Sequence, residues 1–421
     1  MTRKSKARYG LKRTYRINPT VKALRAALLA GVMAATLAPT AATAAPFRDV
    51  VIEDIAPVDD AFIYNEDELA ALAENIAAGI VAMSYFGDAG VVNHGDITAV
   101  ADASLGLYGN SAIAAGIYAL AKYEAVIVND GDISATAIAQ ANGSAAAFGL
   151  WAYGGESAVI ENAGNVEVYA ASEYGNATAV GIYAASYSDA VVENSGSITA
   201  TALVSYSDNY GYATTASAIG IDASGYSVSI DNTGDIEASA SNDLYFGAAV
   251  AIGINAEAYA DITISNTGDI SLSGSSGDGY ARSGYYPNYI YVTGDFNATG
   301  INAESYIGSI SVTNSGDITI VDLNEGGGIA GGYRSGDKLT GISAKTVLGD
   351  ASISNSGDIN ITGGEAALGI VATTDQLTEY YDCPPPYDTG YYICYDRTGG
   401  GDADAGGDGR AGGGPPVELT Q

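Results

Sequence analysis

The sequence predicts an all-β protein whose body is a right-handed, three-sided parallel β-helix of about nine coils, with variable loops on one corner. Three observations predict this fold: a recurring Asn-x-Gly motif, a recurring Gly-Ile/Leu-x-Ala motif, and apolar residues that alternate with polar ones around both motifs. Alternation with a period of two is typical of strands with one buried face. Repeats of a few tens of residues are typical of solenoids, in which each repeat forms one turn of a stack.

The spacing of the two motifs predicts where the loops lie. From each motif Gly to the next Asn the distance is 12 to 14 residues, whereas from that Asn to the next Gly it ranges from 14 to 34. A stack of coils in which one corner absorbs every insertion has this property. The motifs begin at Asn93, Asn129, Asn162, Asn194, Asn232, Asn266, Asn314 and Asn355, and at Gly79, Gly116, Gly149, Gly181, Gly220, Gly253, Gly300, Gly341 and Gly369.

Each coil supplies three short strands. A β-branched aliphatic residue such as Val91 stands two before each Asn, Ile or Val such as Ile97 stands four after it, and Ala always stands three after the Gly. Strands joined without helices cannot form a doubly wound sheet, but they can form a prism whose coils are about 4.8 Å apart. We expect the Asn side chains to form a hydrogen-bonded ladder along this rod, and the corner Gly to supply a positive φ.

The N-terminus predicts export. Residues 1–44 contain nine Lys or Arg and no acid, then the apolar run Ala26 to Ala38 and the small-residue cleavage pattern Ala42-Thr43-Ala44. We therefore expect a signal peptide that directs the chain through the Sec machinery. That run of 13 residues is too short to span a bilayer and no later run is long enough, so we expect no transmembrane helix.

The ends of the rod need closing segments. We expect a linker at residues 45–60 and the β-helix at 61–375. Within 61–80, the repeat spacing of Ile63, Asn65 and Leu69 favours a degenerate first coil, and the alternative is a capping helix with Asn65 as N-cap. Residues 376–397 are expected to close the far end, with Cys383 and Cys394 paired as a disulfide in an oxidising compartment. The Gly/Pro-rich residues 398–421 are expected to be a disordered tail.

The charge of the chain excludes several partners. Without the signal peptide, the chain has 8 basic and 49 acidic residues and therefore a formal charge of −41. Such a surface repels phosphate backbones, anionic lipid and acidic polysaccharides. The sequence therefore excludes nucleic acid and leaves metal cations, neutral glycans, basic proteins or further copies of the chain.

A column of carboxylates suggests a cation site. Three residues after the motif Asn stands an Asp in six of eight coils, and stacked carboxylates repel one another by about 1 kcal/mol per neighbour. A bound structural Ca²⁺ as cofactor would relieve this repulsion. The alternative is that Asp suits a solvated turn after Gly. The candidate ligands are Asp235, Asp269, Asp317 and Asp358.

Two aromatic columns suggest a binding surface. Tyr118, Trp151 and Tyr183 occupy outward positions on consecutive coils, and exposed aromatic strips usually make contacts. The alternative is a structural stack that adds rigidity. The variable loops Val204 to Tyr212 and Ser273 to Tyr291 are a further candidate, because their Tyr, Ser, Gly and Asn resemble the composition of paratopes. The second column consists of Tyr187, Tyr226, Tyr259 and Tyr306.

Catalysis has little support in the sequence. The chain has one histidine, His94, which lies within a corner motif and is unsuited to a Ser-His-Asp triad. We therefore expect no enzyme. The alternative is a hydrolase of neutral polysaccharide, which needs two carboxylates about 5 to 9 Å apart and could use Asp269 or Asp317.

The motifs resemble a known family. Asn314-Ser315-Gly316-Asp317-Ile318, Thr340-Gly341-Ile342-Ser343-Ala344 and the long basic leader together resemble type V autotransporter passengers with extended signal peptides, over residues 1–375. The resemblance implies display at the outer-membrane surface or release, through an outer-membrane β-barrel translocator. It also implies an adhesin or structural role toward a glycan or protein of a host or neighbouring cell, or self-association. Passengers of this shape include adhesins, proteases and esterases, so the resemblance fixes no activity.

One feature departs from the family. Autotransporters end in a translocating barrel, whereas this sequence ends in the Gly/Pro-rich stretch Gly399 to Pro416 and carries no barrel signal. We expect either a truncated or split chain, or a barrel encoded as a separate polypeptide.

Overall fold

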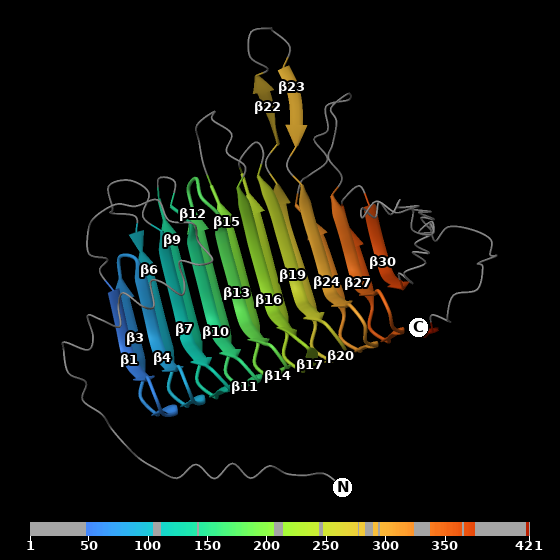
Figure 1. Ribbon diagram of the computed structural model, residues 1–421. Coiled ribbons are helices and arrows are strands. Elements are labelled where there is room, and N and C mark those ends of the chain that lie inside the picture. The colour runs from blue at the N-terminus through green and yellow to red at the C-terminus, as the bar shows by residue number, and fades with distance from the viewer. Residues whose placement is uncertain are drawn as a thin grey trace, which may run out of the picture.

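The structure is a computed structural model that describes residues 48–103, 111–140, 143–205, 214–243, 247–276, 278–282, 289–293, 295–323, 337–363, 366–374 and 418–420. Within these residues the chain contains β-strands and no α-helix, and three long parallel sheets form the sides of a prism (Figure 1). The chain passes through sheet A, sheet B and sheet C in turn and then enters the next coil. This is the predicted three-sided parallel β-helix.

Sheet A consists of β1 (Arg48–Ala56), β4 (Ile76–Ser84), β7 (Ala112–Ala121), β10 (Ala145–Gly154), β13 (Ala177–Ser186), β16 (Thr215–Gly225), β19 (Ala248–Ala258), β24 (Phe296–Ser305), β27 (Lys338–Thr346) and β30 (Ala366–Thr374). Sheet B consists of β2 (Ala61–Asn65), β5 (Ala89–Asn93), β8 (Glu124–Asn129), β11 (Ser157–Asn162), β14 (Asp189–Asn194), β17 (Ser227–Asn232), β20 (Ile262–Asn266), β25 (Ile310–Asn314), β28 (Ala351–Asn355) and β31 (Glu418–Thr420).

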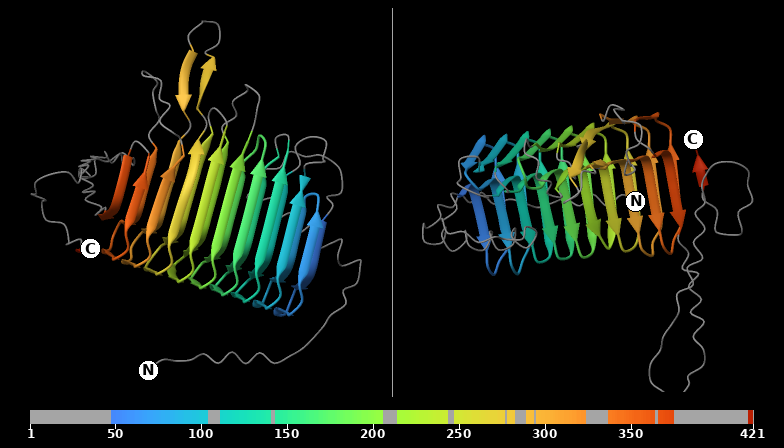
Figure 2. Two further views of the ribbon diagram at one scale, coloured as in Figure 1. Left: turned by 180° about the vertical axis from the view of Figure 1, so that it is seen from behind. Right: turned by 90° about the horizontal axis from the view of Figure 1, so that it is seen from above.

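Sheet C consists of β3 (Leu69–Ala73), β6 (Ile97–Asp102), β9 (Ile133–Ala139), β12 (Val166–Ser172), β15 (Ile198–Val204), β18 (Ile236–Asn242), β21 (Ile270–Ser276), β26 (Ile318–Asp322) and β29 (Ile359–Thr362). The insertions lie at the corner between sheets C and A, as predicted. There the antiparallel hairpin of β22 (Asp278–Arg282) and β23 (Tyr289–Thr293) projects from the rod (Figures 1 and 2).

One continuous core fills the prism. Its inward side chains, such as Ile182 of sheet A, Val192 of sheet B and Ile198 of sheet C, are at most 1% exposed. Burying one such side chain stabilises the fold by about 1.5–3 kcal/mol. Because inward residues alternate with outward ones, the strand register keeps like residues above one another; Ile160, for example, pairs with Val192. The core therefore constrains the inward side chains of each sheet, whereas the outward side chains are free to vary in sequence.

The glycines are needed for close approach rather than for φ. A Cβ on Gly131 would overlap the carbonyl oxygen of Gly95 in the preceding coil, and a Cβ on Gly149 would overlap a methyl group of Val166. Among the described glycines, only Gly363 has a positive φ, of 92°. The prediction that the corner glycines supply a positive φ is therefore wrong. Stacking of the coils at a short spacing is what excludes a side chain there.

The ends of the rod differ in part from the predictions. The expected linker 45–60 is wrong in part, because β1 already belongs to sheet A and pairs with β4 along its length. Residues 61–73 form β2 and β3 of the first coil and residues 76–80 begin β4 of the second, so the degenerate coil is confirmed and the capping helix is wrong. The expected disordered tail 398–421 includes β31, which pairs with β28. Residues 1–44 and both cysteines lie outside the described residues.

Candidate functional site

The asparagine ladder occupies the corner between sheets B and C. From Asn93 to Asn314, each amide nitrogen donates both to the amide oxygen of the next coil's Asn and to the carbonyl of the Gly two residues on, whereas Asn65 makes the second of these bonds to Asp67. For Asn162 these distances are 2.7 Å to Asn194 and 2.7 Å to Gly164. The ladder starts at Asn65, one coil earlier than the eight predicted residues, and continues to Asn355. All its members are buried and hydrogen-bonded, so the ladder holds the coils together.

The Asp column beside the ladder also connects coils. The carboxylate Oδ1 of Asp235 accepts the backbone N–H of Asp269 at 3.0 Å, and Asp269 and Asp317 accept in the same way from the next coil. This bond explains an Asp at a solvated turn without a cation. No group of three His, Cys, Asp or Glu side chains that could hold a metal ion occurs among the described residues. The geometry therefore gives the predicted calcium site no support.

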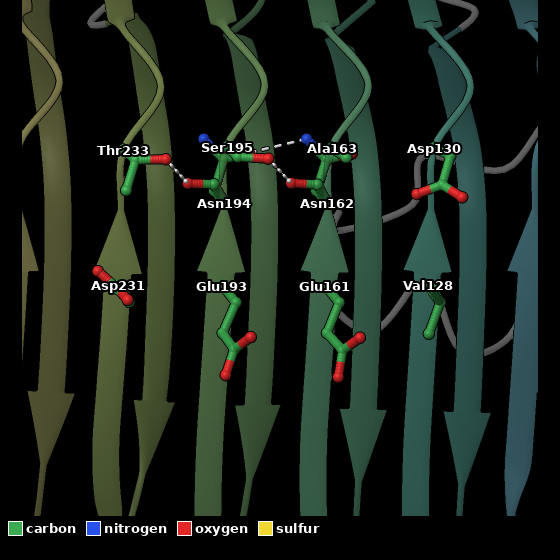
Figure 3. A pocket seen from close by; sticks show the side chains of 10 residues that line it. All are labelled: Val128, Asp130, Glu161, Asn162, Ala163, Glu193, Asn194, Ser195, Asp231 and Thr233. Atoms are coloured by element: carbon green, nitrogen blue, oxygen red, sulfur yellow. Dashed lines mark hydrogen bonds between the residues drawn. The ribbon is translucent and has the colours of Figure 1, made fainter. Parts of the chain in front are cut away.

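A shallow groove lies on the outer face of sheet B near the same corner (Figure 3). It has a volume of about 300 Å³ and is open to solvent. Glu161, Glu193 and Asp231 stand side by side on successive strands along its floor, and Asp130 lies at one end. This row of acids fits the overall charge of the chain. His94 lies nearby as an exposed residue, with its Nδ1 2.7 Å from an Asp130 carboxylate oxygen.

The first predicted aromatic strip is not exposed. Tyr118 is only 2% exposed, and Trp151 and Tyr183 are partly buried. The rings meet edge to face at centroid distances of 5.4 and 5.0 Å. Burial raises the pKa of the Tyr118 hydroxyl. The prediction of an exposed strip failed because the neighbouring outward residues on this face, among them Met83 and Phe148, are also apolar and form a second cluster with it.

The second aromatic column is exposed as predicted. Tyr187, Tyr226, Tyr259 and Tyr306, here called the tyrosine edge, each follow the end of a sheet A strand at the corner between sheets A and B. They are 77%, 49%, 50% and 48% exposed, respectively. The rings of Tyr226, Tyr259 and Tyr306 lie one above another, with centroid distances of 5.6 and 5.5 Å. The tyrosine edge thus presents ring edges and hydroxyls to solvent along the rod.

Sheet A also carries a polar row that was not predicted from the sequence. Asp222, Asn255 and Asn302, here called the amide row, occupy the same register on β16, β19 and β24, facing outward. Asn302 donates to Asn255 at 2.9 Å, and Asn255 donates to Asp222 at 2.9 Å. Burial raises the pKa of Asp222, and the nearby charge of Glu257 adds to the shift, whereas the bond from Asn255 opposes it.

A signal for the amide row was present in the sequence. The variable residue of the Gly-Ile/Leu-x-Ala motif is Tyr118, Trp151 and Tyr183 in three successive coils, and Asp222, Asn255 and Asn302 in the next three. Only the aromatic residues at this position were predicted to form a column. The remaining predicted loop residues lie partly outside the described residues, and the side chains of β22 and β23 are not described.

No protein-family model, no curated protein and no solved structure matches the chain. Among the described residues there is also no helix with the length and apolar character needed to cross a membrane.

Proposed function

We propose that the chain is an exported, autotransporter-like adhesin or structural passenger that contacts a host or neighbouring cell through its tyrosine edge. The resemblance of its motifs and leader supports the route to the cell surface. The rod supports the role, because a stack of coils around one core places the tyrosine edge in line along four successive coils and holds it rigid.

The observation that carries the proposal is where apolar side chains are exposed. More than half of the exposed large apolar side chains in the described part of the chain lie at the corner between sheets A and B; besides the tyrosine edge they include Phe86, Tyr123, Ile307 and Leu348. Exposed aromatic residues gathered in a line mark contact surfaces, because Tyr buries a large area while its hydroxyl still finds a polar partner. Lys122 adds a cationic group to this corner, because its ammonium lies 5.3 Å from the ring centres of both Phe86 and Tyr123.

Replacing the tyrosine edge tests this proposal. The triple variant Tyr226→Ser, Tyr259→Ser and Tyr306→Ser should reduce the attachment of protein-coated beads to cells by roughly tenfold or more, because a few central aromatic residues usually dominate an interface. The matched control is Leu72→Ser with Leu323→Ser, which removes exposed apolar side chains, 67% and 54% exposed, from elsewhere on the rod.

Circular dichroism should show the same β-rich spectrum for both variants. Equal attachment of the wild type and the tyrosine variant, or an equal loss in the leucine control, would contradict the proposal. Export is tested separately by N-terminal sequencing of the protein recovered outside the cytoplasm. The proposed route requires a new N-terminus at Ala45.

A further inference from the structure

We propose that the amide row of sheet A, together with the tyrosine edge beside it, is a binding strip for a neutral, hydroxyl-rich saccharide chain that lies along the rod. This inference rests on the proposed function and deepens it, because it gives the chemical class of the cell-surface partner. The evidence is the hydrogen bonding within the amide row and the placement of polar side chains between this row and the tyrosine edge.

The hydrogen bonds between members of the amide row all run from one coil to the preceding coil. Asn255 is only 8% exposed, and its amide is fixed by donation to Asp222, a longer donation of 3.5 Å to Glu257, and acceptance from Asn302. The Asn302 amide therefore uses one N–H inside the row. Among the described residues its side chain makes no other hydrogen bond, so its carbonyl oxygen and second N–H remain for a ligand. A fixed amide with one free donor and one free acceptor suits a pair of neighbouring hydroxyl groups.

Two further columns run parallel to the amide row. The first of these columns lies two residues farther along the same strands, on the same face, and consists of Ser224, Glu257 and Glu304. The strand repeat places this column about 7 Å from the amide row. The tyrosine edge follows two residues later. A ligand on this surface thus meets donors, acceptors and aromatic rings in each coil. Sites for polar small molecules combine a few placed polar groups with aromatic walls in the same way.

The repeat of these columns favours a polymer over a single sugar. Each of the three coils that contain β16, β19 and β24 offers one copy of the pattern, and the rings of the tyrosine edge in these coils repeat at 5.5 to 5.6 Å. A saccharide chain that advances by one ring per coil meets similar groups in each of these three coils. Each step adds a small interaction, and the sum of several steps yields measurable affinity.

The charge on this face restricts the kind of saccharide. Glu257 and Glu304 are exposed and Asp222 lies beside them. The basic side chains on this face, Lys338 and Lys345, come one coil later on β27. An acidic polysaccharide would be repelled by the carboxylates, whereas hydroxyl groups of a neutral one can donate to them.

The chain contains an intrinsic fluorescent residue that can report binding to this strip. Trp151 is the single tryptophan of the sequence, and its ring lies 5.0 Å from that of Tyr183, whose strand position is paired with Asp222. We would titrate the purified protein with cellohexaose, mannohexaose, maltohexaose and hexagalacturonate, following tryptophan fluorescence and calorimetric heat. The expected result is saturable binding of at least one neutral hexasaccharide and none of the acidic one.

The Asn302→Ala variant should weaken that binding roughly tenfold or more, because it removes the free donor and acceptor from the row. The matched control is Thr201→Ala, which removes an outward polar group from sheet C and should bind as the wild type does. The proposal is overturned if no neutral hexasaccharide binds at millimolar concentration, if hexagalacturonate binds as well as the neutral chains do, or if Asn302→Ala binds as the wild type does.

Failure of this inference and failure of the proposed function give different results. Attachment to cells that needs the tyrosine edge, without any saccharide binding, overturns the saccharide strip alone. Saccharide binding that is lost in Asn302→Ala, while the tyrosine variant still attaches to cells, overturns the adhesive role of the edge and retains the strip.

Discussion

The outer face of sheet A has two halves that differ although their strands are equivalent. On β4, β7 and β10 the outward residues are apolar, and Val81, Met83 and Tyr118 are at most 2% exposed. On β16, β19 and β24 the same register positions hold Asp222, Asn255 and Asn302, with exposed Glu257 and Glu304 beside them. The inward residues of both halves are mainly Ala and Ile, apart from Leu150 on β10 and Phe296 on β24.

This difference teaches that the repeat constrains only part of each coil. The core requires the inward residues, and the close spacing of coils requires the glycines and the asparagine ladder, so these recur in every coil. The outward residues have no such requirement, because a sheet in a solenoid is stable with either an apolar or a polar outer face. Functional differences along the rod are therefore carried by outward positions and loops.

The largest expected effect separates the two halves directly. Tyr118→Ala should lower the free energy of unfolding by about 3–5 kcal/mol, because it removes a buried aromatic ring. Asn302→Ala, at the equivalent position in the polar half, should lower it by less than about 1 kcal/mol. Urea unfolding followed by circular dichroism measures both. Similar losses in the two variants would mean that the halves do not differ in packing.

The framework of the rod could be predicted from the sequence better than its surface. The regular recurrence of the Asn and Gly motifs, with apolar residues at fixed distances, determined the coils, the corner with the loops and the ladder. It did not determine the exposure of Tyr118, because burial on an outer face depends on neighbours such as Met83 and Phe148 that belong to other coils. The amide row was missed for a related reason, since Asp222, Asn255 and Asn302 form one chain of hydrogen bonds only when the coils are stacked.

A smaller effect should be the same in both halves. Asn93→Ala lies in the coil of β4 and Asn266→Ala in the coil of β19, and each removes two hydrogen bonds of the ladder. Each also removes the acceptor of the preceding buried Asn, so we expect a loss of about 2 kcal/mol in both variants. Equal shifts of the urea midpoint would show a common framework. A shift confined to one variant would show that the ladder differs along the rod.

The smallest effect concerns the pH dependence of the polar half. Burial raises the folded-state pKa of Asp222, so the folded protein binds this proton more tightly than the unfolded chain does. The stabilisation that protonated Asp222 provides is complete below the ordinary pKa of Asp, about 3.9, and is lost as the pH rises through the raised folded-state pKa. Asp222→Asn should therefore be more stable than the wild type at pH 7, and this advantage should vanish on acidification.

Urea midpoints of the wild type and Asp222→Asn between pH 3 and pH 7 measure this difference. Asp231→Asn, which removes the same charge from an exposed position on sheet B, separates the effect of burial from that of net charge. If both variants gain the same stability at pH 7, general repulsion in an acidic protein accounts for the gain. If only Asp222→Asn gains, the polar half of sheet A holds a carboxylate in a position that costs stability, which is expected of a residue retained for binding.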